Sequence, residues 1–173
     1  MGKKTKTVSV RVSDDLGNLL EDESKSNGVS INTLINQVLI KHTQWERFER
    51  ELGILHISKQ TVKRLFSVVS EDEIKTLAAT SCKSMLRDMV LFIKGQVDVN
   101  NLLETISIWL SANNISFRHI KIQTIDRYII KHDLGRNYSL YLSTTIDLLF
   151  NEIDKKIKEV IIREHDLIFE IER

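Results

Sequence analysis

The 173-residue chain contains no proline and a single cysteine, Cys82. One cysteine excludes an intrachain disulfide and a cysteine-rich zinc site. Without proline, the breaks between segments depend on Gly, Asn, Asp and Ser. The sequence also lacks any run of about 18 apolar residues, and its basic N-terminus is not followed by the apolar core of a secretory signal. We therefore expect a cytoplasmic protein without a membrane partner.

A strong net charge is also missing, because 25 Lys and Arg residues nearly balance 24 Asp and Glu residues. A surface that binds nucleic acid would therefore require local segregation of charge. Residues 1–12 provide such segregation, since they contain basic but no acidic residues, whereas residues 14–23 are acidic. A basic terminus often serves only solubility, so charge alone does not decide the function.

Recognisable catalytic motifs are absent as well. The sequence contains no nucleophile elbow, Walker loop, dinucleotide fingerprint or His-Glu-x-x-His element. We therefore expect a protein that is not an enzyme, with no catalytic residue and no cofactor. The function is then expected to lie in binding.

The N-terminal region has a regular pattern of segments. Residues 7–12 read Thr-Val-Ser-Val-Arg-Val, an alternation of polar and apolar side chains that is typical of a half-buried strand. Ser13 is a favourable N-cap for a first helix, which we expect to end at Gly28. Ser30 is placed to cap a second helix, which we expect to continue to Leu52.

This order of strand, helix, glycine turn and helix resembles the ribbon–helix–helix family of DNA-binding proteins, of the MetJ, Arc and CopG type. The resemblance covers about residues 5–45 and rests on Val8, Val10, Val12, Ser13, Leu16, Leu20, Gly28, Val29, Ser30, Leu34, Ile35, Val38 and Leu39. It implies a homodimer whose chains pair their strands into an intermolecular two-stranded antiparallel ribbon. Such a ribbon enters the major groove of double-stranded DNA. The resemblance also allows several dimers to assemble into a higher oligomer on DNA.

The resemblance also implies the residues of the DNA-binding site. Base edges are read by the alternating positions Thr7, Ser9 and Arg11, of which Arg11 suits a bidentate contact with guanine. DNA phosphates are held by the start of the second helix and by the basic arm, that is by Ser30, Ile31, Asn32, Lys3, Lys4 and Lys6. The dimer core consists of Val8, Val10, Val12, Leu34, Ile35 and Val38.

The pattern changes after residue 52, so we expect one domain over 1–52 and a second over 53–173. Helices are predicted near 58–69, 71–94, 98–113 and 137–157, and strands within 115–132 and 158–172. The expected fold class is α+β, with an N-terminal ribbon–helix–helix followed by a helical segment and an antiparallel α+β domain.

Three roles compete for the second domain: a ligand or metal sensor, an oligomerisation platform, and a binding site for a protein partner. Nickel-responsive regulators join a sensor domain to the same DNA-binding fold, but their clustered His-x-His followed by Cys is absent. A weaker metal candidate is a repeated pattern at the ends of two predicted strands, which contains His132, Asp133, His165 and Asp166. If the two strands were neighbours, these pairs would lie close together and could bind a metal. The preferred interpretation is that they are charged residues that simply end the strands.

The sequence therefore predicts a sequence-specific, homodimeric DNA-binding transcriptional regulator. Its C-terminal domain is expected to sense an effector or to support oligomerisation. The alternative is an interaction, assembly or antitoxin-like protein that uses the N-terminal module chiefly as a dimer clamp. The sequence reveals neither the operator, nor the effector, nor the direction of regulation.

Overall fold

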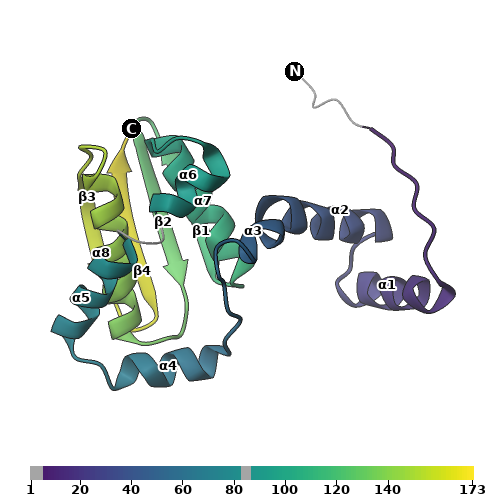
Figure 1. The fold of residues 1–173 in the computed structure, drawn as a ribbon, viewed down its shortest axis with the longest axis horizontal. Helices are drawn as coiled ribbons and strands as arrows, with labels where there is room; N and C mark the ends of the chain where they lie inside the picture. The colour runs from purple at the N-terminus through teal and green to yellow at the C-terminus, as the bar shows by residue number, and fades with distance from the viewer. Residues whose placement is uncertain (1–5, 83–86) are drawn as a thin grey trace. The chain divides into compact units, whose positions relative to one another are not determined.

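The computed structural model describes residues 6–82 and 87–173 (Figure 1). The chain divides into two compact units, of which the first ends at Gln44 and the second spans Trp45–Arg173. Within the described ranges, no helix combines the length and the apolar character needed to cross a bilayer.

The first unit contains a pair of helices, α1 (Asp14–Ser26) and α2 (Ile31–Lys41). The side chains of Ser13 and Ser30 each accept a hydrogen bond from an N–H group of the following first turn, so both predicted N-caps are confirmed. Gly28, between the helices, has a φ of +64°, a left-handed conformation that glycine adopts without strain. The helical hairpin therefore follows from local signals.

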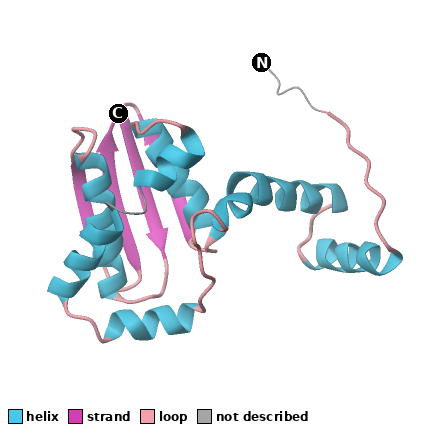
Figure 2. Ribbon diagram, in the orientation of Figure 1, coloured by secondary structure: helices cyan, strands magenta, loops and turns pink. Residues whose placement is uncertain are grey.

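The predicted N-terminal ribbon is wrong. Residues 6–13 form no strand, and every strand in the described part of the chain lies in the second unit (Figure 2). Alternating Val8, Val10 and Val12 specify an apolar face, but a strand also requires a neighbour that pairs its backbone N–H and C=O groups. The first unit offers no such neighbour, so this segment is irregular and the N-terminal unit is helical.

The second helix is also shorter than expected. A π-helical turn (His42–Glu46) and the short α3 (Arg47–Glu49) follow α2, so the helical path ends before Leu52. Four further helices come next in the chain, namely α4 (Lys59–Ser67), α5 (Glu71–Ser81), α6 (Arg87–Lys94) and α7 (Val99–Ala112). They lie within the segments that were predicted to be helical.

An antiparallel sheet forms the centre of the second unit. Its strands are β1 (Ser116–Ile122), β2 (Ile125–Lys131), β3 (Ile157–Ile162) and β4 (Asp166–Glu172), and α8 (Arg136–Asn151) connects β2 to β3. The strand order is β1-β2-β4-β3, and all neighbours are antiparallel. Helices α7 and α8 pack against the sheet (Figure 1). The antiparallel α+β character predicted for this region is therefore present.

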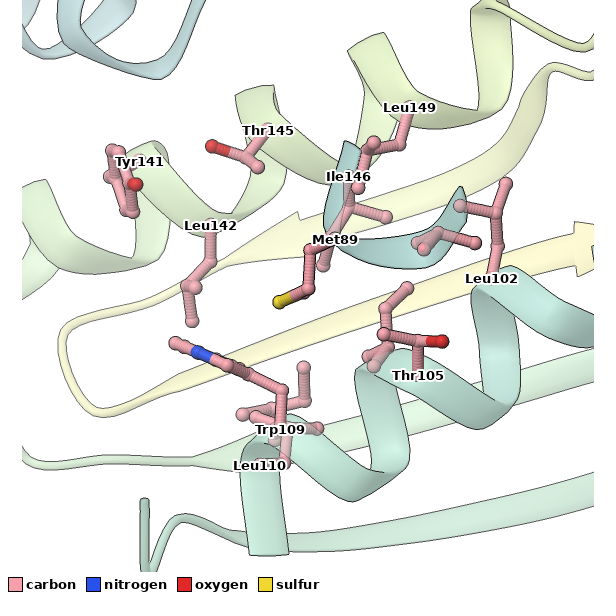
Figure 3. Close-up of a pocket in the computed structure, with 13 residues that line it drawn as sticks. Met89, Leu102, Thr105, Trp109, Leu110, Tyr141, Leu142, Thr145, Ile146 and Leu149 are labelled. Carbon is pink, nitrogen blue, oxygen red and sulfur yellow. The ribbon is translucent and has the colours of Figure 1, made fainter. Parts of the chain in front are cut away.

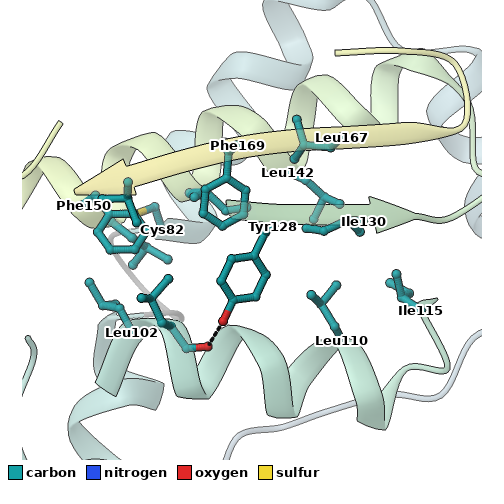
Figure 4. Close-up of a cluster of buried hydrophobic side chains, with 14 of the residues drawn as sticks. Cys82, Leu102, Leu110, Ile115, Tyr128, Ile130, Leu142, Phe150, Leu167 and Phe169 are labelled. Carbon is teal, nitrogen blue, oxygen red and sulfur yellow. Dashed lines mark hydrogen bonds between the residues drawn. The ribbon is translucent and has the colours of Figure 1, made fainter. Parts of the chain in front are cut away.

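The core lies between the sheet and these helices (Figure 4). Leu102 and Leu110 of α7, Phe150 of α8 and Phe169 of β4 belong to it, and all four side chains are nearly or fully inaccessible to solvent. Tyr128 of β2 is buried among them, and its hydroxyl donates to the Leu103 carbonyl oxygen at 3.1 Å. This bond satisfies a hydroxyl that would otherwise be costly to bury.

Candidate functional site

The first unit exposes most of its apolar side chains. Leu34 is the only apolar side chain that its described residues bury. Eight large apolar side chains of the same unit are exposed, namely Val8, Val10, Val12, Leu16, Leu19, Val38, Leu39 and Ile40. Large exposed apolar surface often marks a site of interaction with a partner. The unit therefore has no complete core within one chain.

The residues predicted to form a dimer core differ in their burial. In α2, Leu34 is buried and Ile35 is half-buried, whereas Val38 is 52% exposed. Val8 and Val10 are exposed by 72% and 76%. The side chains of Val8, Val10 and Val38 are therefore available to a second molecule, whereas that of Leu34 is not.

The predicted base-reading residues precede α1. Thr7, Ser9 and Arg11 are all exposed, as is Lys6. Lys3 and Lys4, which were also predicted to contact phosphates, lie outside the described residues. The described positions are thus accessible to a ligand, and their contact with DNA stays a prediction.

The start of α2 is suited to an anion. Its first intrahelical bond runs from the Leu34 N–H to the Ser30 carbonyl oxygen at 3.0 Å, and the Ser30 hydroxyl accepts from the Thr33 N–H at 3.1 Å. The N–H groups of Ile31 and Asn32 precede these bonds. The first turn of α2 contains no acidic residue, whereas that of α1 contains two. The acidic residues at the start of α1 would repel a phosphate, whereas the start of α2 has no such charge and is favourable for one.

The histidine–aspartate pairs at the strand ends do come close, because β2 and β4 are neighbours and Lys131 pairs with Asp166. However, His132 is 2% exposed, and both of its ring nitrogens have protein partners. Its Nδ1 accepts from the Leu134 N–H at 3.1 Å, and its Nε2 lies 2.8 Å from the Ser139 hydroxyl oxygen. The Ser139 hydroxyl in turn donates to the Arg163 carbonyl oxygen.

This network assigns a structural role to His132. A ring that accepts at Nδ1 is neutral and donates from Nε2, and burial lowers the pKa of His132, which favours the neutral form. Of its predicted companions, His165 and Asp133 form an exposed contact, with His165 Nδ1 lying 3.8 Å from an oxygen of Asp133. Asp166 lies 3.5 Å from a nitrogen of Arg163. Across the described ranges, no group of three or more His, Cys, Asp or Glu residues could hold a metal ion.

A different charged cluster was not predicted from the sequence. Asp126 of β2 is fully buried, and its carboxylate accepts hydrogen bonds from the Arg173 guanidinium, one of them at 3.0 Å, and contacts His119 Nε2. The His119 ring stacks on Tyr128 with their centroids 4.3 Å apart. These groups line an open groove of about 330 Å³ that also includes Lys121. The cluster joins the end of the chain to the β1–β2 hairpin.

The sequence contained one signal for this cluster. Asp126 occupies an inward position in the alternation of β2, together with Tyr128 and Ile130. A carboxylate at such a position needs a partner, because an unpaired buried charge is strongly unfavourable. The partner itself, Arg173, lies 47 positions away in the chain and has no local signal.

Asp126 gives the fold a defined pH dependence. Hydrogen bonds from Arg173 hold the pKa of this carboxyl below its ordinary value, against the smaller opposing effect of burial. The unfolded chain therefore binds the proton first as the pH falls. The stabilisation is complete above about pH 4, the ordinary value, and disappears as the pH falls through the lowered pKa.

We expect the stability advantage of the wild type over Asp126→Asn to be large at pH 7 and to shrink below about pH 4. Urea unfolding of both proteins between pH 7 and pH 3 measures this difference in the free energy of unfolding. A difference in free energy of unfolding that stays constant over this range would contradict the assignment.

Comparisons with known proteins identify no family. No family model matches the chain, and no curated protein matches it. Among solved structures, the Fe(II) unliganded H-NOX protein from K. algicida and a point mutant of it were found. Each is 17% identical and has a TM-score of 0.28, with 96% of this chain and 76% of that chain covered. A TM-score this low supports no inference about fold or function.

Proposed function

We propose that this protein is a homodimeric, DNA-binding transcriptional regulator whose N-terminal unit provides both the dimer contact and the DNA contact. The observation that carries the proposal is the exposed apolar surface of that unit, where a single buried apolar side chain accompanies eight exposed ones. The second unit, with its own core, then modulates or assembles the regulator. We assign no catalytic role to either unit.

A second copy of the same chain is the partner that fits this surface. Most soluble oligomers are symmetric homo-oligomers, in which one patch contacts the same patch of the other copy. The exposed valines before α1 and the exposed aliphatic residues at the end of α2 are apolar surface that a second copy could cover. Burying it would supply the core that one unit lacks.

Double-stranded DNA is the ligand that fits the adjoining polar groups. Arg11, Ser9 and Thr7 alternate with the valines along one exposed segment, and Lys6 adds a positive charge. The start of α2 offers free N–H groups to a phosphate. The resemblance of about residues 5–45 to ribbon–helix–helix regulators, of which the helical hairpin but not the strand is present, suggests the same ligand. The proposal does not include a β-ribbon.

Arg11→Ala tests the DNA contact. Selection from a pool of random-sequence duplexes first identifies the sites that the full wild-type chain prefers. On the best site we expect Arg11→Ala to cost about 1–3 kcal/mol of binding free energy and to relax the preference at one position. Lys6→Ala is the matched control, because a phosphate contact weakens binding to all sequences equally.

Two outcomes would contradict the proposed DNA contact: the first would refute DNA binding itself, and the second would refute the reading of bases by Arg11. One is the absence of any enriched site together with no binding to the pool at low salt. The other is an Arg11→Ala variant that binds every duplex as tightly as the wild type does. A dimer that persists in the first case would favour the alternative in which the N-terminal unit is chiefly a dimer clamp.

A further inference from the structure

An apolar cavity that is partly open to solvent lies in the second unit, among α6, α7, α8 and β2 (Figure 3). Its volume is about 70 Å³, and its walls include Met89, Leu102, Trp109, Leu142 and Ile146. One water molecule needs about 10–15 Å³ measured in this way, so the cavity has room for more than one. Apolar walls hold water poorly, because water needs several polar partners.

Two hydroxyl groups in the cavity wall have no hydrogen-bond partner among the described residues. They belong to Thr105 of α7 and Thr145 of α8, whose side chains are 2% and 4% exposed. A hydroxyl within a helix commonly donates to the carbonyl four residues earlier. Ser107 and Ser111 of the same helix α7 do so, at 2.8 and 2.9 Å. Burying these two hydroxyls without a partner therefore destabilises the fold, whereas the paired hydroxyls of Ser107 and Ser111 do not have this effect.

The residue types in the cavity wall also determine which molecules cannot bind there. None of the lining residues that the structure describes is charged. A charged ligand would lose its hydration here without gaining a counter-charge, which is strongly unfavourable. A purely apolar ligand would fill the space but would leave both hydroxyls unpaired.

We propose that this cavity is a binding site for a small, uncharged and largely apolar molecule that carries one hydroxyl or carbonyl group. The apolar part fills the space beside Met89 and Leu142, and the polar group pairs with Thr105 or Thr145. This site goes beyond the proposed DNA binding and does not depend on it. It makes the second unit a receptor for such a molecule.

Phenol and benzene are matched probes, because they differ only by one hydroxyl. We expect the full chain to bind both, with phenol bound more tightly, as measured by calorimetry and by chemical shifts of the methyl groups in the wall. In the double variant Thr105→Val/Thr145→Val, we expect phenol binding to weaken about tenfold, because one hydrogen bond contributes about that factor to the dissociation constant. Benzene binding should be retained. The single variants identify which hydroxyl pairs with the probe.

Ser107→Ala is the control, because this hydroxyl lies on the same helix but already has a partner and does not line the cavity. We expect it to bind phenol as the wild type does. Thermal unfolding shows whether each variant is folded, and the valine variants should be at least as stable as the wild type because they remove unpaired hydroxyls. The proposal is overturned if the wild type binds neither probe, or if the double valine variant retains the full preference for phenol.

Discussion

Val10→Lys is expected to convert the proposed dimer to a monomer and to abolish DNA binding. In one chain the Val10 side chain is 76% exposed, so a lysine there leaves the fold of the single chain unchanged. In a dimer the same position would be covered by the apolar patch of the second copy. An unpaired ammonium group in such an interface costs several kcal/mol.

Each 1.4 kcal/mol corresponds to a factor of about ten in the dissociation constant, so we expect the dimer to weaken by more than about 100-fold. Sedimentation measures the dimer, and circular dichroism checks that the helices persist. Ser9→Lys is the matched control, because it adds the same charge at the adjoining polar position. A Val10→Lys protein that remains a dimer would contradict the assignment of this residue to the dimer core.

Leu167→Ala is expected to have the largest effect on the stability of the second unit. The side chain is fully buried in β4, and the residue pairs with Ile130 of β2 and Ile162 of β3. Removing a buried leucine costs the transfer free energy of the lost carbon atoms and leaves a cavity, together about 2–5 kcal/mol. This loss is a large part of the total stability of an ordinary domain.

The same substitution at an exposed leucine provides the control. Leu55 is 83% exposed, and we expect Leu55→Ala to change the free energy of unfolding by less than about 0.5 kcal/mol. Urea unfolding of the three proteins at pH 7 gives both differences. Equal losses at the two positions would contradict the core described for the second unit.

Local signals in the sequence were sufficient for the helices and for most strands. Ser13 and Ser30 each have an N–H group within reach in the next turn, so their capping follows from neighbouring residues. In β2, the alternation of Asp126, Tyr128 and Ile130 with less buried residues likewise follows from the period of a strand. Such features need no knowledge of distant residues.

Features that depend on distant partners were not predictable in this way. The valines before α1 have the pattern of a strand but no neighbouring strand among residues 6–82 and 87–173, so the predicted ribbon is absent. Thr105 and Thr145 meet at one cavity only because α7 and α8 pack on the same sheet. His132 was only a weak metal candidate in the sequence, and its hydrogen-bond partner Ser139 became evident only in the fold.

Sedimentation of the full wild-type chain, alone and with its selected duplex, tests the central proposal most directly. We predict a dimer in the absence of DNA and a complex of two chains on one duplex, which dissociates steeply as salt is raised from 50 to about 200 mM. A chain that sediments as a monomer and separately from the duplex at 50 mM salt would contradict it.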